Sequence, residues 1–305
     1  MVKDECDIVK DWILYHGYLF GFENIYIIDN YSTDGTYEII NEFKDYINIF
    51  REDDYKKKGI YMTLYIKTYS HLNELSFPID IDEFIVFYNR IENCINTNKQ
   101  IINNYLSKLP QIKLYKMNYI ISNPTDEHGF ERATIESKYG LYSDYGILAK
   151  SFINMSLYNG DVDHGNHIPV DNYFLSDLCL IHFHDRNLEQ IKKKIYNNCV
   201  GLGHKIDLSY LKKLEKEVAG YHHVNGMILI LENNYKLYCN NYVETDVNLT
   251  TFSEKIKELI NDYEKFNWNK YTEKYIDLVK NGINDKKKAW IHWVNHGKLE
   301  NRKFN

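Results

Sequence analysis

The chain has 305 residues, of which 44% are hydrophobic and 26% charged, as expected for a globular protein that buries a sizeable core. Its formal net charge of −6, with acids and bases interleaved, argues against a nucleic-acid-binding protein, and no apolar stretch approaches the length of a membrane span, about 20 residues. The polar N-terminus and 5 scattered cysteines without a CxxC pair predict no signal peptide, reduced thiols and a cytoplasmic location.

The N-terminal part of the chain alternates between helical and strand patterns. A helix is expected over residues 4–20, where one apolar stripe is formed by Ile8, Trp12, Tyr15 and Leu19. Strands and helices then alternate, with strands over 24–29, 47–51 and 77–82 and helices over 36–44 and 58–75. This order predicts an α/β fold with a mostly parallel, Rossmann-like sheet that is covered by helices.

The rest of the chain is less regular. We expect helices over 97–109 and 188–202, strands over 112–121, 132–138, 146–153 and 177–184, and polar loops over 122–130 and 158–169. The chain from residue 207 onward is predicted to be mostly helical, and residues 262–305 to form a small Trp-containing module. These patterns predict a main domain over residues 1–205 and a helical C-terminal extension over residues 206–305.

The segment Asp80-Ile81-Asp82 is expected to end a buried strand. Residues i and i+2 of a strand face the same side, so the two carboxylates would point to one place, where their oxygens suit Mg²⁺ or Mn²⁺. The alternative is a strand end whose acids cap the next turn. The run Lys56-Lys57-Lys58 is interpreted as the solvated start of a helix.

A second acidic turn follows the strand over 24–29. Asp29 lies at the expected strand end, where it could accept hydrogen bonds from a nucleotide base or ribose. Asp34 could contribute to the same pocket, or it could only cap the helix that follows.

These segments together resemble the GT-A glycosyltransferases of the family-2 type, in the branch related to the family-92 enzymes. The resemblance covers about residues 3–202 and rests on Lys3–Glu5, Asp11–His16, Ile25–Thr36, Asp80–Phe84 and His182–Asn187. It implies a GT-A domain that transfers a hexose-type sugar from a nucleotide sugar, usually UDP-linked, to a glycan or glycoprotein acceptor.

The resemblance also implies roles for single residues. Mn²⁺ or Mg²⁺ would be held by Asp80, Asp82 and His182. The nucleotide-sugar donor would be contacted by Asp29, Asn30, Asp34, Asp80 and Arg186.

The catalytic base is left open between residues of the two polar loops. An inverting transfer needs a carboxylate that takes the proton of the acceptor hydroxyl, and the candidates are Glu127, Asp161 and Asp163, with Asp126 beside them. Each of them could equally be a solvated loop residue. His164 and His167 could line the acceptor or close over the donor.

Only Met1 and Val2 precede Lys3, so the first strand of a GT-A domain is expected to be absent or very short. Two alternatives to the transferase follow: a catalytically weakened GT-A-like binding protein and a nucleotide-sugar phosphohydrolase. The chain could also associate as a homo-oligomer. The C-terminal module resembles one appended to glycosyltransferases of giant DNA viruses and some bacteria, and with 28 Tyr residues and abundant Asn, Ile and Lys it suggests a giant-virus source.

Overall fold

The computed structural model describes residues 1–305 except 71–74, 215, 219, 244 and 305. The α-helices are α1 Val9–Phe20, α2 Thr36–Glu42, α3 Lys58–Tyr69, α4 Lys99–Leu106, α5 Ala133–Glu136, α6 Leu188–Gly201, α7 Leu208–Leu211, α8 Tyr221–Leu231, α9 Thr250–Lys265, α10 Trp268–Lys274, α11 Ile276–Lys280 and α12 Lys286–His292. The strands are β1 Tyr26–Asp29, β2 Asn48–Arg51, β3 Leu75–Ser76, β4 Glu83–Asn89, β5 Cys94–Asn96, β6 Leu114–Ile121, β7 Tyr139–Ser143, β8 Lys150–Asn154, β9 Phe174–His182 and β10 Val247–Asn248.

The centre of the molecule is a mixed sheet that closes on itself. Around the ring the order is β6, β7, β10, β5, β4 and β9, and β9 pairs back with β6. Within this ring β10–β5 and β6–β9 are parallel pairs, whereas β6–β7, β7–β10, β5–β4 and β4–β9 are antiparallel. β8 and β3 extend the sheet from the first half of β6.

The prediction of an α/β protein is confirmed in the sense of a mixed α/β fold, but the mostly parallel, Rossmann-like sheet is wrong. A separate parallel pair, β1–β2, is joined through α2 as predicted. Val2 adds one parallel bridge to Asp29. From β4 onward neighbouring strands pair mostly antiparallel, as in β4–β5, β4–β9 and β6–β7, where the prediction expected parallel crossovers.

Helix α1 shows how local pattern and packing combine. All four residues of the predicted stripe, Ile8, Trp12, Tyr15 and Leu19, are buried. The helix packs against β4 and α9. It begins at Val9 rather than at Asp4, because the preceding residues run alongside β1, where the Val2 N–H donates to the Ile28 carbonyl at 2.8 Å.

Two predicted strands are not strands. Residues 77–82 form an irregular segment and a turn, and the strand begins only at Glu83. Residues 132–138 contain the short helix α5, whose Glu136 carboxylate accepts the N–H groups of Glu131 and Arg132. Pairing with β9, from Glu83↔His182 to Phe87↔Leu178, decides which part of the apolar run over 77–87 becomes a strand.

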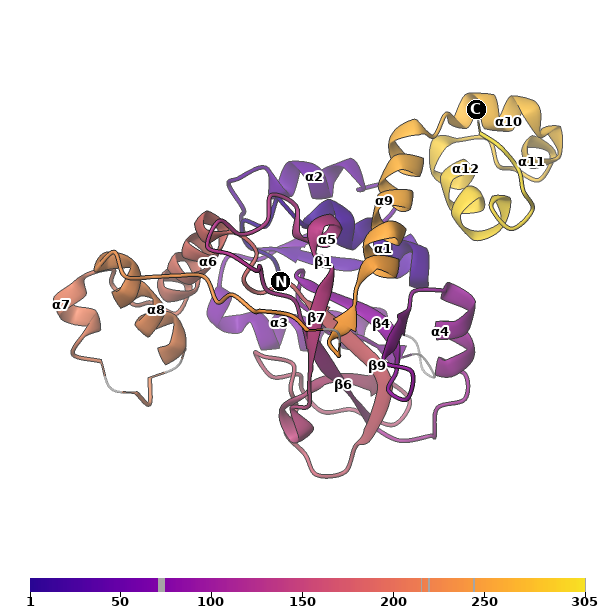
Figure 1. The fold of residues 1–305 in the computed structure, drawn as a ribbon. Coiled ribbons are helices and arrows are strands. Elements are labelled where there is room, and N and C mark those ends of the chain that lie inside the picture. The colour runs from indigo at the N-terminus through magenta and orange to yellow at the C-terminus, as the bar shows by residue number, and fades with distance from the viewer. Residues whose placement is uncertain (71–74, 215, 219, 244, 305) are drawn as a thin grey trace.

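Two lobes flank the central body (Figure 1). On one side, α6, α7 and α8 surround a small core of their own, which contains Ile191, Ile195, Leu211, Val224 and Met227. On the other side, α10, α11 and α12 form a compact unit at the end of α9.

Part of the expected extension over residues 206–305 packs in the main core. Val247, Leu249 and Phe252 are buried in the main core, so β10 and α9 belong to the body. The small module over 262–305 is joined to that core through Trp290, whose ring lies 6.4 Å from that of Phe22. The main domain over residues 1–205 stays a prediction. In the structure, β10 and α9 also contribute to its core.

Candidate functional site

The turn that carries Asp80 and Asp82 precedes β4. The Glu83 N–H donates to the Asp80 carbonyl at 3.1 Å, and the Asp80 N–H donates to Glu83 Oε2 at 2.8 Å. The indole Nε1 of Trp12 donates to the carbonyls of Asp80 and Glu83, at 3.1 and 3.0 Å. Because the segment is a turn, the same-face geometry of a strand does not apply, and the two carboxylates have different partners.

Two lysines hold the Asp80 carboxylate. Its Oδ1 accepts from Lys58 Nζ of α3 at 2.7 Å, and its Oδ2 accepts from Lys150 Nζ of β8 at 2.8 Å. Lys150 also pairs with Glu83 at 3.0 Å, and its side chain is 2% exposed. Burial would raise the pKa of Asp80, but Lys150 and Lys58 outweigh it and hold that pKa well below its usual range.

Asp82 lies at the centre of a second set of basic side chains. Its Oδ2 is 2.5 Å from Lys194 Nζ of α6, 3.4 Å from His182 Nε2 at the end of β9, and 3.8 Å from Arg186 Nη1. Burial would raise the pKa of Asp82, but Lys194, His182 and Arg186 together hold it well below its usual range. A carboxylate so surrounded stays ionised.

Arg186 links this cluster to the N-terminal segment. It is buried, pairs with Glu5, and donates from Nε to Asp7 Oδ2 at 3.0 Å. Its Nη1 also donates to the Phe183 carbonyl at 2.8 Å. The predicted donor residue Arg186 is therefore placed beside Asp82, with its fork engaged by two carboxylates and a carbonyl.

The acidic side chains of the turn after β1 make hydrogen bonds within the fold. Asp29 is fully buried and accepts from the Ser32 N–H at 3.1 Å and from Arg51 Nε at 3.0 Å. The Asn30 side-chain amide donates to the Glu52 carbonyl at 2.7 Å. Nucleotide contacts from Asp29 and Asn30 stay predictions.

Asp34 fits the capping alternative. Its Oδ1 accepts from the N–H and the hydroxyl of Thr36, at 3.0 and 2.5 Å, at the start of α2. Its Oδ2 lies 3.2 Å from Lys193 Nζ. A nucleotide contact from Asp34 stays a prediction.

The loop over 158–169 lies against the Asp80 lysines, because the Gly165 carbonyl accepts from Lys150 Nζ at 3.2 Å. The Asp163 carboxylate accepts the N–H groups of His167 and Ile168, at 2.9 and 3.0 Å, and so shapes the loop. Asp161 is 81% exposed and pairs with Lys67 at 2.8 Å.

Two histidines of this loop face the same region. The His164 ring lies 4.8 Å from the ring of Tyr55. Besides burial, the charges of Lys58 and Asp80 both act on the pKa of His164. Burial lowers the pKa of both His164 and His167. An acceptor-lining role for these two rings stays a prediction.

Glu127 lies in a different place. Its loop packs beside Arg186 and Leu237, where a side chain in place of Gly129 would have no space. Burial raises the pKa of the Cys239 thiol, and the nearby carboxylates of Asp126 and Glu127 raise it further. None of the three base candidates is in hydrogen-bond contact with Asp80 or Asp82 among the described residues, and the base stays a prediction.

Three lysines of the site were missed by sequence reasoning. Lys58 is buried rather than solvated, so the interpretation of Lys56 to Lys58 as a surface run is wrong for its last member. Lys150 stands within a buried strand, a signal that could have marked it as a paired charge. Lys194 gave no local signal, since α6 carries lysines at 192, 193 and 194.

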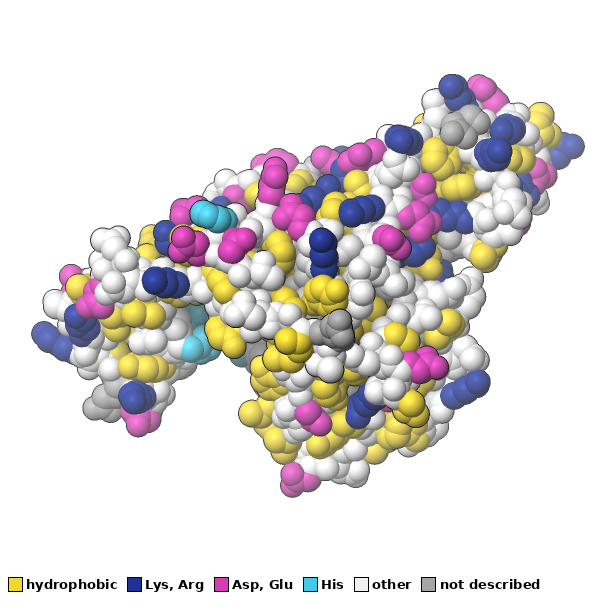
Figure 2. Space-filling view, viewed as in Figure 1, with side chains coloured by type: hydrophobic (Ala, Val, Ile, Leu, Met, Phe, Trp, Pro, Cys, Tyr) yellow, Lys and Arg dark blue, Asp and Glu magenta, His cyan; other side chains and the backbone are white. Residues whose placement is uncertain are grey.

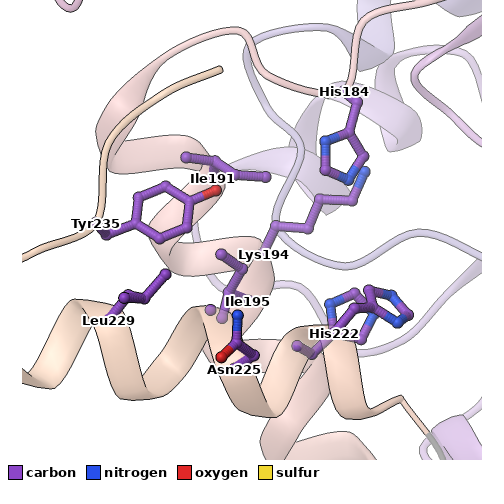
Figure 3. A pocket seen from close by; sticks show the side chains of 10 residues that line it. His184, Ile191, Lys194, Ile195, His222, Asn225, Leu229 and Tyr235 are labelled. Carbon is purple, nitrogen blue, oxygen red and sulfur yellow. The ribbon is translucent and has the colours of Figure 1, made fainter.

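A cavity of about 230 Å³ adjoins Lys194 between α6 and α8 (Figure 3). Ile191, Ile195 and Leu229 form its apolar part, and polar groups come from His184, His222, His223, Asn225 and Tyr235. Figure 2 shows histidine side chains where the α7–α8 lobe meets the body. Burial lowers the pKa of His222, and lowers that of His223 to about 3.

A divalent cation at this site would need carboxylate oxygens that are free to bind it. Both Asp80 oxygens and Asp82 Oδ2 already accept from lysine ammonium groups. Outside the eight residues left undescribed, no three or more His, Cys, Asp or Glu side chains are grouped so that they could hold a metal ion. In this arrangement the residues do not fit Mn²⁺ or Mg²⁺, which favour several oxygen ligands.

The fold and the site thus define a mixed α/β protein with a charged cluster at one end of a closed sheet. No family description and no curated protein matches the chain. Among solved structures, it is similar to the crystal structure of TarS residues 1–349 from S. aureus, with 11% identity and a TM-score of 0.36 over 76% of this chain and 68% of that chain. A likeness this distant carries no argument about function. None of the described helices combines the length and the apolar character that a membrane crossing requires.

Proposed function

We propose that this protein is a glycosyltransferase that moves a sugar from a nucleotide sugar, UDP-linked if the resemblance holds, to a glycan or glycoprotein acceptor. One observation carries the proposal. His182 and Arg186 come from a motif far along the chain, yet both lie within 4 Å of Asp82, at 3.4 and 3.8 Å. The two segments on which the resemblance rests, Asp80–Phe84 and His182–Asn187, thus contribute side chains to one charged cluster.

The chemistry of the cluster suits a leaving diphosphate. Such a group gains negative charge as the sugar departs, and fixed cations nearby stabilise that charge. Lys58, Lys194 and Arg186 provide them. Asp80 and His182, at 30% and 21% side-chain exposure, mark where the cluster meets solvent.

An acceptor hydroxyl must also lose a proton. Of the predicted bases, Asp161 and Asp163 belong to the loop that contacts Lys150, which favours this loop over the one that carries Glu127. The Mn²⁺ or Mg²⁺ ion with ligands Asp80, Asp82 and His182 stays a prediction of the resemblance. So do the homo-oligomer, the cytoplasmic location and the giant-virus source.

The proposal is tested by incubating the full chain with a panel of UDP- and GDP-sugars and glycan acceptors, and measuring release of the nucleoside diphosphate. Replacement of Asp82 by Asn keeps its shape and removes the charge that holds Lys194, His182 and Arg186. We expect Asp82→Asn to lower release by roughly 100-fold, the loss typical of a disrupted electrostatic site. The control is Asp177→Asn on the far part of β9, where the carboxylate is 47% exposed and 3.7 Å from Arg90.

One result would contradict the role of the cluster, and two would contradict the transferase. Equal release by wild type and Asp82→Asn would separate the cluster from the activity. Free sugar formed at the same rate with and without acceptors would indicate the phosphohydrolase. Binding of a nucleotide sugar without turnover across the panel would indicate the binding protein.

A further inference from the structure

The two aspartates that the resemblance assigns to a cation are already neutralised by protein cations. Asp80 accepts from Lys58 and Lys150 at 2.7 and 2.8 Å, and Asp82 accepts from Lys194 at 2.5 Å. With Glu83 included, three carboxylates face three ammonium groups in the centre of the site. The charge that a divalent cation would supply to these carboxylates is present in the chain itself.

Lys150 in particular cannot be displaced cheaply. Its ammonium group contacts Asp80, Glu83 and the Gly165 carbonyl, and its side chain is 2% exposed. Moving it would leave the buried Glu83 carboxylate without an ion-pair partner among the described residues, which is strongly unfavourable. A divalent cation bound to Asp80 would therefore lie beside an ammonium group that stays in place, and like charges at that distance repel.

We infer that this site binds the diphosphate of its nucleotide without a divalent metal, through the ammonium groups of Lys58 and Lys194. This inference rests on the proposed function and names how its donor is held. Each of these two ammonium groups makes one hydrogen bond to a carboxylate among the described residues, and an ammonium has three N–H donors. The side chain of Lys194 is 21% exposed and that of Lys58 is 8% exposed, and lysine ammonium groups are common partners of phosphate oxygens.

The surroundings of Lys194 leave space for such a ligand. Its side chain forms part of the wall of the cavity of about 230 Å³ (Figure 3), and its ammonium group donates to Asp82 Oδ2 at 2.5 Å. Asp82 and Asp80 act here as positioning residues, because each fixes a lysine by a short ion pair. An incoming diphosphate would meet ammonium N–H groups rather than bare carboxylates.

The test is calorimetric titration of UDP, and in parallel GDP, into the full chain in EDTA and in excess Mn²⁺. We expect one of the two nucleotides to bind with dissociation constants that agree within about threefold in the two buffers. Binding that requires Mn²⁺ would overturn the inference and leave the proposed transferase standing. Absence of binding in both buffers would overturn the inference and the proposed function together.

Matched lysine variants locate the contact. Lys58→Met and Lys194→Met keep most of the side-chain volume and remove one charge each, and each should weaken nucleotide binding in EDTA by about tenfold or more. Lys57→Met is the control, because Lys57 is adjacent, 54% exposed and paired with Asp54. Circular dichroism and thermal melts verify that each variant is folded. Unchanged affinity in folded Lys58→Met and Lys194→Met would contradict the assignment even if EDTA has no effect.

Discussion

Carboxylates of the same acidic turn differ in their partners. Asp29 is buried against Arg51, whereas Asp34 holds the first residues of α2 and contacts Lys193. The Arg51 guanidinium lies over the rings of Tyr31 and Tyr37, at 4.2 and 4.0 Å, which fixes it beside Asp29. The role of an acid in this turn is therefore set by the cation or N–H group that faces it.

Asp34 gives a pH-dependent prediction. Burial would raise its pKa, but hydrogen bonds from Thr36 and Cys6 outweigh burial and lower the pKa from 3.8 to about 2. Because the folded pKa lies below the unfolded one, ionised Asp34 stabilises the fold above about pH 4, by about 2 kcal/mol, and this is lost as the pH falls towards about 2. Urea unfolding of wild type and Asp34→Asn should therefore differ at neutral pH and converge in acid. A difference that is constant with pH would contradict this account.

At the scale of elements, the turn before β4 depends on a helix distant in sequence. Trp12 of α1 donates to both the Asp80 and the Glu83 carbonyls, and the Phe183 N–H donates to the Asp82 carbonyl at 2.9 Å. The turn is thus fixed between α1 and the segment that follows β9. A rigid turn of this kind keeps two carboxylates in place beside their lysines.

Loss of the indole donor tests this dependence. Trp12→Phe leaves two carbonyls without that partner, so it should lower the free energy of unfolding by about 1–3 kcal/mol more than a matched tryptophan change. Trp293→Phe is the match, because Trp293 is buried and its Nε1 has no hydrogen-bond partner among the described residues. Urea denaturation measures both, and equal losses would show that the indole N–H contributes nothing.

At the scale of the whole molecule, the central ring is completed by a strand from late in the chain. β10 inserts between β5 and β7, and α9 then packs on α1 and α5. The lobe of α6 to α8 leaves the body between β9 and β10 (Figure 1). The cavity at Lys194 therefore lies where a lobe joins the body.

Truncation separates the parts of the C-terminal region. A chain that ends after residue 246 loses Val247, Leu249 and Phe252 from the main core, so we expect no cooperative unfolding transition. A chain that ends after residue 265 keeps them and loses the contact of Trp290 with Phe22, so it should fold with a lower melting temperature. Calorimetric melts distinguish the two, and a cooperative transition in the shorter chain would contradict the role given to β10.

Local pattern determined much of the first half of the structure. The α1 stripe, β1, α2 and β2 follow from apolar spacing over a few residues, and the same holds for α4, β6 and α6. The sequence also predicted site roles for Asp80, Asp82, His182 and Arg186. In the structure His182 and Arg186 lie beside Asp82. These features depend on residue types and spacings that are present along the chain itself.

The tertiary structure decided the rest, because pairing between distant segments is not written in local periodicity. Strand direction in the ring, the turn at Asp80 and the placement of β10 each depend on which partner strand is available. Lys58, Lys150 and Lys194 come from a helix, a strand and a second helix, and only the folded chain brings them to the two aspartates. The sequence identified the two aspartates, His182 and Arg186, whereas three-dimensional packing supplied the three lysines that pair with the aspartates.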